Sequence, residues 1–185
     1  MKLIKLLILI LLYLPSNSKS SEVTTLVTID NQTITNIDLA NEIKTIEIMK
    51  NIKLTSSESS LVLNNMINEK IKYIETQNKA IEFNKNEVAN NYNAIINKNL
   101  DIDPEIKKNI QDKLIVTSKW NNLVLKKFRG KLDINSSEID QIIKDKKLNE
   151  MERDKIIIRE KNKKLNVLSK TFFNEVKKKY LIKRF

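Results

Sequence analysis

The sequence contains no cysteine and no histidine, and Gly130 is the only glycine among its 185 residues. Cysteine and histidine are the usual zinc ligands and the usual partners in Ser–His–Asp and Cys–His nucleophile systems, so such sites are excluded. Phosphate-binding loops need several glycines, because the backbone must approach the phosphate closely, so nucleotide-binding motifs are excluded too. The absence of cysteine also excludes disulfides and lipidated cysteines. An enzyme would have to use Asp, Glu, Lys and Tyr, and we expect a binding protein without metal or cofactor.

Composition predicts one mainly helical domain. Apolar residues make up 41% of the chain and charged residues 31%, a balance typical of chains that fold. The length suits a single domain, since typical domains have about 100–200 residues. Aromatic residues reach only 5%, and isoleucine and leucine dominate the apolar set. This pattern favours an aliphatic helical core over a β-sandwich.

Residues 1–20 are predicted to be a secretory signal peptide. Lys2 and Lys5 give a positive start, and an unbroken apolar run covers residues 6–14. Pro15 and small residues follow, as at a signal cleavage site. The alternative is an uncleaved membrane anchor, but a spanning helix needs about 20 apolar residues and this run is shorter. We therefore expect a periplasmic protein, and export argues against nucleic acid as the partner of a basic chain.

The net charge of +11 is concentrated near the C-terminus. Residues 144–185 hold fifteen Lys and Arg against six Asp and Glu, whereas positive and negative residues balance over 19–143. A basic C-terminal segment of this kind is suited to an anionic membrane surface, where each Lys or Arg contributes about 1 kcal/mol to binding, or to acidic client segments. The alternative is a solvated helix face that carries the lysine bias of the whole chain.

The body is predicted to begin with a β-hairpin. Residues 23–29 are rich in β-branched side chains and largely alternate, which favours a strand. Residues 30–32 have turn chemistry, and Thr33 and Ile34 can return as a second strand. Residues 132–134 are too short to stand alone, so we expect them to pair with the hairpin as a short third strand.

Helix signals fill the rest of the chain. Thr35 with Asp38 forms a capping box, which contributes about 1 kcal/mol, and its helix is expected to bury a face containing Ala40. Asn86 is expected to cap a later helix, and Gly130 to end another. The predicted helices cover about 36–52, 58–81, 86–96, 104–128 and 136–143, with one long amphipathic helix in the basic segment 144–185.

Several segments, in order, resemble SurA-type periplasmic chaperones. Residues 28–39 (TIDNQTITNIDL) resemble the first strand, short polar turn and entry into the first helix of that family. Residues 63–71 (LNNMINEKI) resemble its second helix, and residues 83–88 (FNKNEV) resemble the entry to its third. Residues 134–139 (INSSEI) resemble the junction before its first isomerase module. The resemblance covers about residues 23–143.

The resemblance implies a chaperone without the isomerase. Residues 21–143 would form a SurA N-terminal-like helical domain, and residues 144–185 a basic C-terminal helix that packs on the body or extends from it. The parvulin-like isomerase modules of the family are missing, so no catalytic residue is implied. The implied function is an ATP-independent holdase for unfolded outer-membrane or secreted proteins. The alternative is a non-catalytic envelope scaffold that docks through its basic helix on anionic lipid or a folded partner.

Three aromatic residues are candidates for client binding, namely Tyr73, Trp120 and Phe128, because aromatic side chains dominate binding hot spots. The alternative is that they belong to the core, since Trp120 and Phe128 share a stripe with apolar neighbours on one predicted helix. Asp101 and Asp103, or Asp140 and Asp145, are near each other in the sequence and so are candidate catalytic carboxylates, but Asp103 before Pro104 is expected to be a helix cap. A long C-terminal helix also allows a homodimer in which two chains exchange it.

Overall fold

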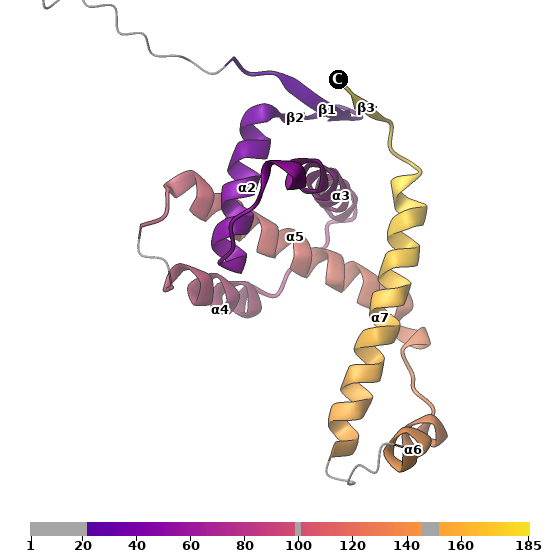
Figure 1. Cartoon of the computed structure of the whole chain (residues 1–185). Helices are drawn as coiled ribbons and strands as arrows, with labels where there is room; N and C mark the ends of the chain where they lie inside the picture. The colour runs from indigo at the N-terminus through magenta and orange to yellow at the C-terminus, as the bar shows by residue number, and fades with distance from the viewer. Residues whose placement is uncertain (1–21, 99–100, 146–151) are drawn as a thin grey trace, which may run out of the picture.

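The computed structural model describes residues 22–98, 101–145 and 152–185 (Figure 1). It confirms the mainly helical class, with a small antiparallel sheet near the N-terminus and a long basic helix near the C-terminus. The predicted signal peptide, residues 1–20, lies outside the described residues.

The sheet joins the two ends of the described chain. Strands β1 (Thr25–Ile29) and β2 (Gln32–Thr35) form the predicted hairpin. Asp30 in its turn has a left-handed φ of 47°, a conformation that Asp tolerates better than most residues. Strand β3 (Ile182–Arg184) pairs antiparallel with the other side of β1, so the order is β2-β1-β3.

The third strand is therefore not the one predicted. Residues 132–134 have no strand structure and follow a 3₁₀ turn, Arg129–Lys131, at the end of the longest body helix. Figure 1 shows that this point lies far from the sheet, whereas the C-terminal helix returns the chain to β1. The sequence pattern correctly predicted that a third short strand joins the hairpin, but not that residues 182–184 supply it.

Six α-helices follow the hairpin in the described residues, close to the predicted ones. They are α2 (Asn36–Lys50), α3 (Ser59–Asn78), α4 (Lys85–Ile96), α5 (Pro104–Phe128), α6 (Ser136–Asp145) and α7 (Arg153–Lys177). A 3₁₀ turn, Ser56–Glu58, precedes α3.

Local capping signals explain most of these starts. The side chain of Thr35 accepts from the Asp38 N–H, and Asp38 returns the bond, as predicted. The cap of α4 is Asn84 rather than Asn86, because its side chain reaches the N–H of Glu87. Gly130 does not end α5 by a left-handed turn: its φ is not positive, and it lies within the 3₁₀ turn.

The main core lies between the sheet, α3, α5 and α7. Trp120 of α5 stacks on Phe172 of α7, with ring centroids 5.4 Å apart and planes 13° apart. Phe128 meets the same Phe172 edge-on at 5.8 Å. A smaller cluster centred on Ile106 and Ile110 joins α5 to α2 and α4. Burial of this apolar surface is what holds α7 against the body.

Helix α7 extends beyond the body and carries α6. Its C-terminal half packs against α5 and α3, and its N-terminal half continues past them with α6 alongside (Figure 1). We call residues 132–135, α6 and residues 153–168 of α7 the arm. In the single chain, the C-terminal helix thus packs in cis, and β3 closes the arrangement on β1.

Candidate functional site

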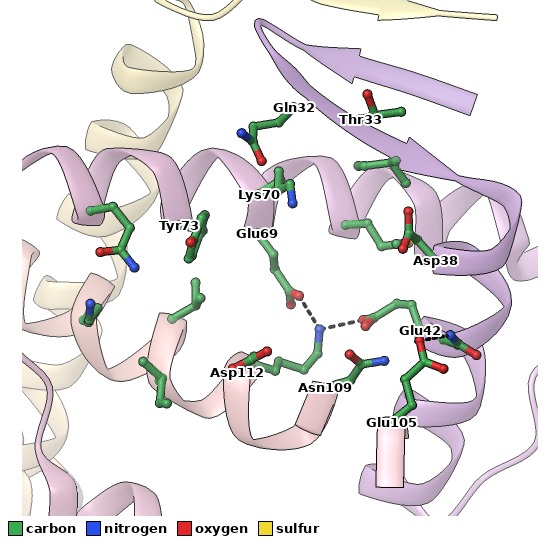
Figure 2. Close-up of a pocket in the computed structure, with 18 residues that line it drawn as sticks. Gln32, Thr33, Asp38, Glu42, Glu69, Lys70, Tyr73, Glu105, Asn109 and Asp112 are labelled. Carbon is green, nitrogen blue, oxygen red and sulfur yellow. Dashed lines mark hydrogen bonds and ion pairs between the residues drawn. The ribbon is translucent and has the colours of Figure 1, made fainter. Parts of the chain in front are cut away.

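A cleft of about 620 Å³ opens between β2, α2, α3 and α5 (Figure 2). We call it the body cleft. It is lined by Gln32, Thr33 and Ile34 of β2, by Asp38, Asn41 and Glu42 of α2, by Met66, Glu69, Lys70, Tyr73 and Gln77 of α3, and by Glu105, Asn109, Asp112, Lys113, Ile115, Val116 and Lys119 of α5. Its size is that of a typical ligand pocket, and most of the residues that line it are polar or charged.

One lysine joins three helices at the base of this cleft. The Nζ of Lys113 on α5 lies 2.6 Å from Oε1 of Glu42 on α2, and it also pairs with Oε2 of Glu69 on α3 (Figure 2). The side chains of Lys113 and Glu42 are 15% and 11% exposed, whereas that of Glu69 is 37% exposed. The attraction is therefore only weakly screened on the Glu42 side and more strongly on the Glu69 side.

Burial and charge act in opposite directions on this group. Burial raises the pKa of Glu42 above its ordinary value, and the attraction of Lys113 offsets this only in part. Burial also lowers the pKa of Lys113, but Glu69 and Glu42 together outweigh it, so the net pKa of Lys113 is raised. Two carboxylates share one ammonium group, so Lys113 stays charged. The attraction of Lys113 does not fully offset the free-energy cost of burying the charged form of Glu42. A lysine held charged in this way is not a nucleophile, since nucleophilic lysines need a lowered pKa.

Sequence reasoning missed these three residues. The first helix carries apolar residues on several sides, and the face expected to be buried contained Ala40, which is exposed. The buried residues of α2 are instead Glu42, Thr45 and Ile46. The signal was available, because Glu42 stands four positions before the apolar Ile46 and so on the same side of the helix. Its partner Lys113, 71 positions away, could not be identified from spacing.

The structure separates the three aromatic candidates. Trp120 is 3% exposed, and its Nε1 donates to Oγ of Ser169 on α7 at 2.9 Å. Phe128 is half-buried against the main core. Tyr73 alone is exposed, at 41%, and lines the body cleft. The three do not form one groove: Trp120 and Phe128 hold α7 in place, and Tyr73 faces another surface.

A second cleft, of about 430 Å³, lies within the arm. We call it the arm groove. It is lined by Ile134 before α6, by Glu138 and Ile142 of α6, and by Glu160, Lys163, Lys164, Val167 and Leu168 of α7. The floor is aliphatic and the rim is charged, and Val167 is 66% exposed. A hydrogen bond from Lys163, 2.8 Å long, is the main cause that lowers the pKa of Glu160.

One member of each acidic pair considered from the sequence has a structural role, namely Asp103 and Asp140. Asp103 caps α5, and its Oδ1 accepts from the Glu105 N–H at 2.7 Å. Asp140 of α6 forms an ion pair of 2.7 Å with Arg153 of α7. Within residues 22–98, 101–145 and 152–185, no group of three or more acidic side chains is arranged to hold a metal ion.

Comparison of the chain with protein-family models and with curated proteins gives no match. The resemblance to SurA-type chaperones therefore stays a prediction from the residues. In the part of the chain that the structure describes, no helix combines the length and apolarity needed to cross a bilayer.

Proposed function

We propose that the protein is an ATP-independent, non-catalytic holdase of the periplasm, which binds unfolded polypeptide segments in the arm groove. The observation that carries this proposal is the groove itself. Ile134, Ile142 and Leu168 offer an aliphatic floor that is half-buried, and Val167 stands at the surface. An exposed apolar surface with a polar rim is typical of interaction sites.

The position of the groove also supports the proposal. The arm extends from the body, so a bound segment would meet α6 and α7 without entering the main core (Figure 1). The rim carries Glu138 and Glu160 together with Lys163 and Lys164, so both signs of charge are present. A rim with both signs of charge does not restrict clients to segments of one charge.

The function is tested by suppression of aggregation. An unfolded outer-membrane protein is diluted from denaturant with and without a several-fold molar excess of the full chain, and light scattering is recorded. A holdase lowers the scattering at low and at moderately high salt, because apolar contacts are only weakly salt-dependent. Undiminished scattering rules out the holdase. Suppression that disappears at higher salt supports instead the scaffold alternative, in which the basic helix binds by charge.

A further inference from the structure

The outer edge of β2 presents backbone groups that the sheet does not use. The Asp30 N–H donates to the Leu181 carbonyl at 3.0 Å, on the β3 side of β1. In an antiparallel pair every second residue bonds to the same neighbouring strand, so the backbone N–H and C=O of Thr28 also point toward β3. Thr28 also lies opposite Thr33 of β2. The N–H and C=O of Thr33 therefore point away from β1. Because β2 is an edge strand in the described part of the chain, they lie on an open edge.

This open edge is the rim of the body cleft. Gln32 and Thr33 are exposed and line the cleft, and Figure 2 places both above the two ion pairs of Lys113. From α3, the cleft is also lined by Tyr73, which is exposed, and by Met66, which is half-buried. A strand added beside β2 would direct every second side chain into the cleft and the others to solvent.

The cleft has a negative lining on a positive chain. Five carboxylates and three ammonium groups line it, against a net charge of +11 for the whole chain. Lys113 is already shared between two of the carboxylates. Glu105 accepts from the neutral amide of Asn41 at 2.8 Å, and Asp112 is exposed and makes no ion pair with any described residue. Glu105 and Asp112 are thus the carboxylates best placed to receive a cation from outside.

We propose that the body cleft docks an extended polypeptide segment bearing lysine or arginine. The segment adds to β2 through the N–H and C=O of Thr33 and places its basic side chains against Glu105 and Asp112. The backbone bonds supply affinity for any extended chain, and the carboxylates select basic segments. This site is separate from the arm groove, so it can be tested whether or not the arm binds clients.

The test is fluorescence anisotropy with the full chain and labelled peptides of about six residues. One peptide alternates Lys with Thr, a second replaces each Lys by Glu, and a third is the Lys peptide with alternate backbone N–H groups methylated. We expect the Lys peptide to bind and to weaken as salt rises. The Glu peptide and the methylated peptide should each bind about tenfold more weakly or less.

Variants locate the site. Thr33→Pro removes the outward N–H without removing a bond to β1, and an edge strand tolerates such a proline. Thr33→Val keeps the N–H and is its control. Glu105→Gln combined with Asp112→Asn removes the two charges, and Glu87→Gln, on the exposed face of α4, is the control.

We expect the proline variant to bind the Lys peptide about tenfold more weakly than Thr33→Val does, and the double variant to bind it about tenfold more weakly than the wild type. The affinity of Glu87→Gln should stay within about twofold of the wild type. Equal binding of the Lys and Glu peptides, or wild-type affinity in the double variant, would overturn the proposal. If the proline variant does not fold, the methylated peptide decides the backbone part: unchanged binding of that peptide also overturns it.

Discussion

Tyr180, near the C-terminus, donates a hydrogen bond of 3.0 Å to the carboxylate of Glu75 on α3. The Glu75 side chain is only 7% exposed, and Lys79 lies 3.4 Å from its other oxygen. Burial, followed by the hydrogen bond and charge of Glu75 and the charge of Asp30, raises the pKa of Tyr180 to about 12. This contact fixes the turn between α7 and β3, and so ties the C-terminal end of the chain to α3 of the body.

Replacement of Tyr180 by Phe should therefore destabilise the protein. It removes the neutral donor to a buried carboxylate, and hydrogen bonds to charged groups contribute about 1.5–3 kcal/mol. Lys79 remains nearby, so we expect a loss of about 1–2 kcal/mol in the free energy of unfolding, measured by urea titration. Tyr92→Phe on α4 is the matched control and should change stability less. Equal urea midpoints for Tyr180→Phe and wild type would show that the contact does not hold the segment.

Lys113 should be needed to join α2, α3 and α5. Lys113→Met leaves the carboxylates of Glu42 and Glu69 facing each other without a cation. Loss of one partner from a fully buried pair costs about 3–5 kcal/mol, and the exposure of Glu69 reduces this to about 2 kcal/mol here. Urea titration at neutral pH measures the loss. Lys119→Met, on the same helix and cleft, should change stability much less; similar losses in the two variants would contradict this role.

Glu42 should contribute more to the free energy of unfolding at acidic pH than at neutral pH. Its pKa is raised in the folded state, so the folded state binds a proton more readily than the unfolded state. The stability that this group contributes is complete below its unfolded pKa and is lost as pH rises through the folded pKa. The difference in unfolding free energy between wild type and Glu42→Gln should therefore shift in favour of wild type as pH falls from neutral to its ordinary pKa. A shift toward Glu42→Gln would mean that the folded pKa is lowered instead.

Local signals in the sequence predicted the elements well. The capping box of Thr35 and Asp38 spans three residues, so sequence alone contains both partners. The start of α5 at Asp103 and Pro104 is local in the same way. Hydrophobic periodicity likewise placed Trp120 on an apolar stripe. Its exposure of 3% confirms the alternative prediction that Trp120 belongs to the core.

Pairings between distant segments could not be predicted in this way. The third strand pairs Ile182 with Ile29, and many short apolar segments have a pattern equally suited to that partner. Residues 132–134 have such a pattern, but the length and direction of α5 carry them away from the sheet. The ion pair of Lys113 and Glu42 is of the same kind, because only the packing of α5 on α2 brings the two together.

Binding of unfolded polypeptide in the arm groove can be tested with a pair of variants on α7. Val167→Asp places a charge at the mouth of the groove, whereas Ile158→Asp alters a similarly exposed apolar residue of the same helix that does not line it. Affinity for a labelled, unfolded outer-membrane protein is measured for both by anisotropy. We expect about tenfold weaker binding for Val167→Asp and near wild-type binding for Ile158→Asp. Equal affinities in the two variants would contradict binding in the arm groove.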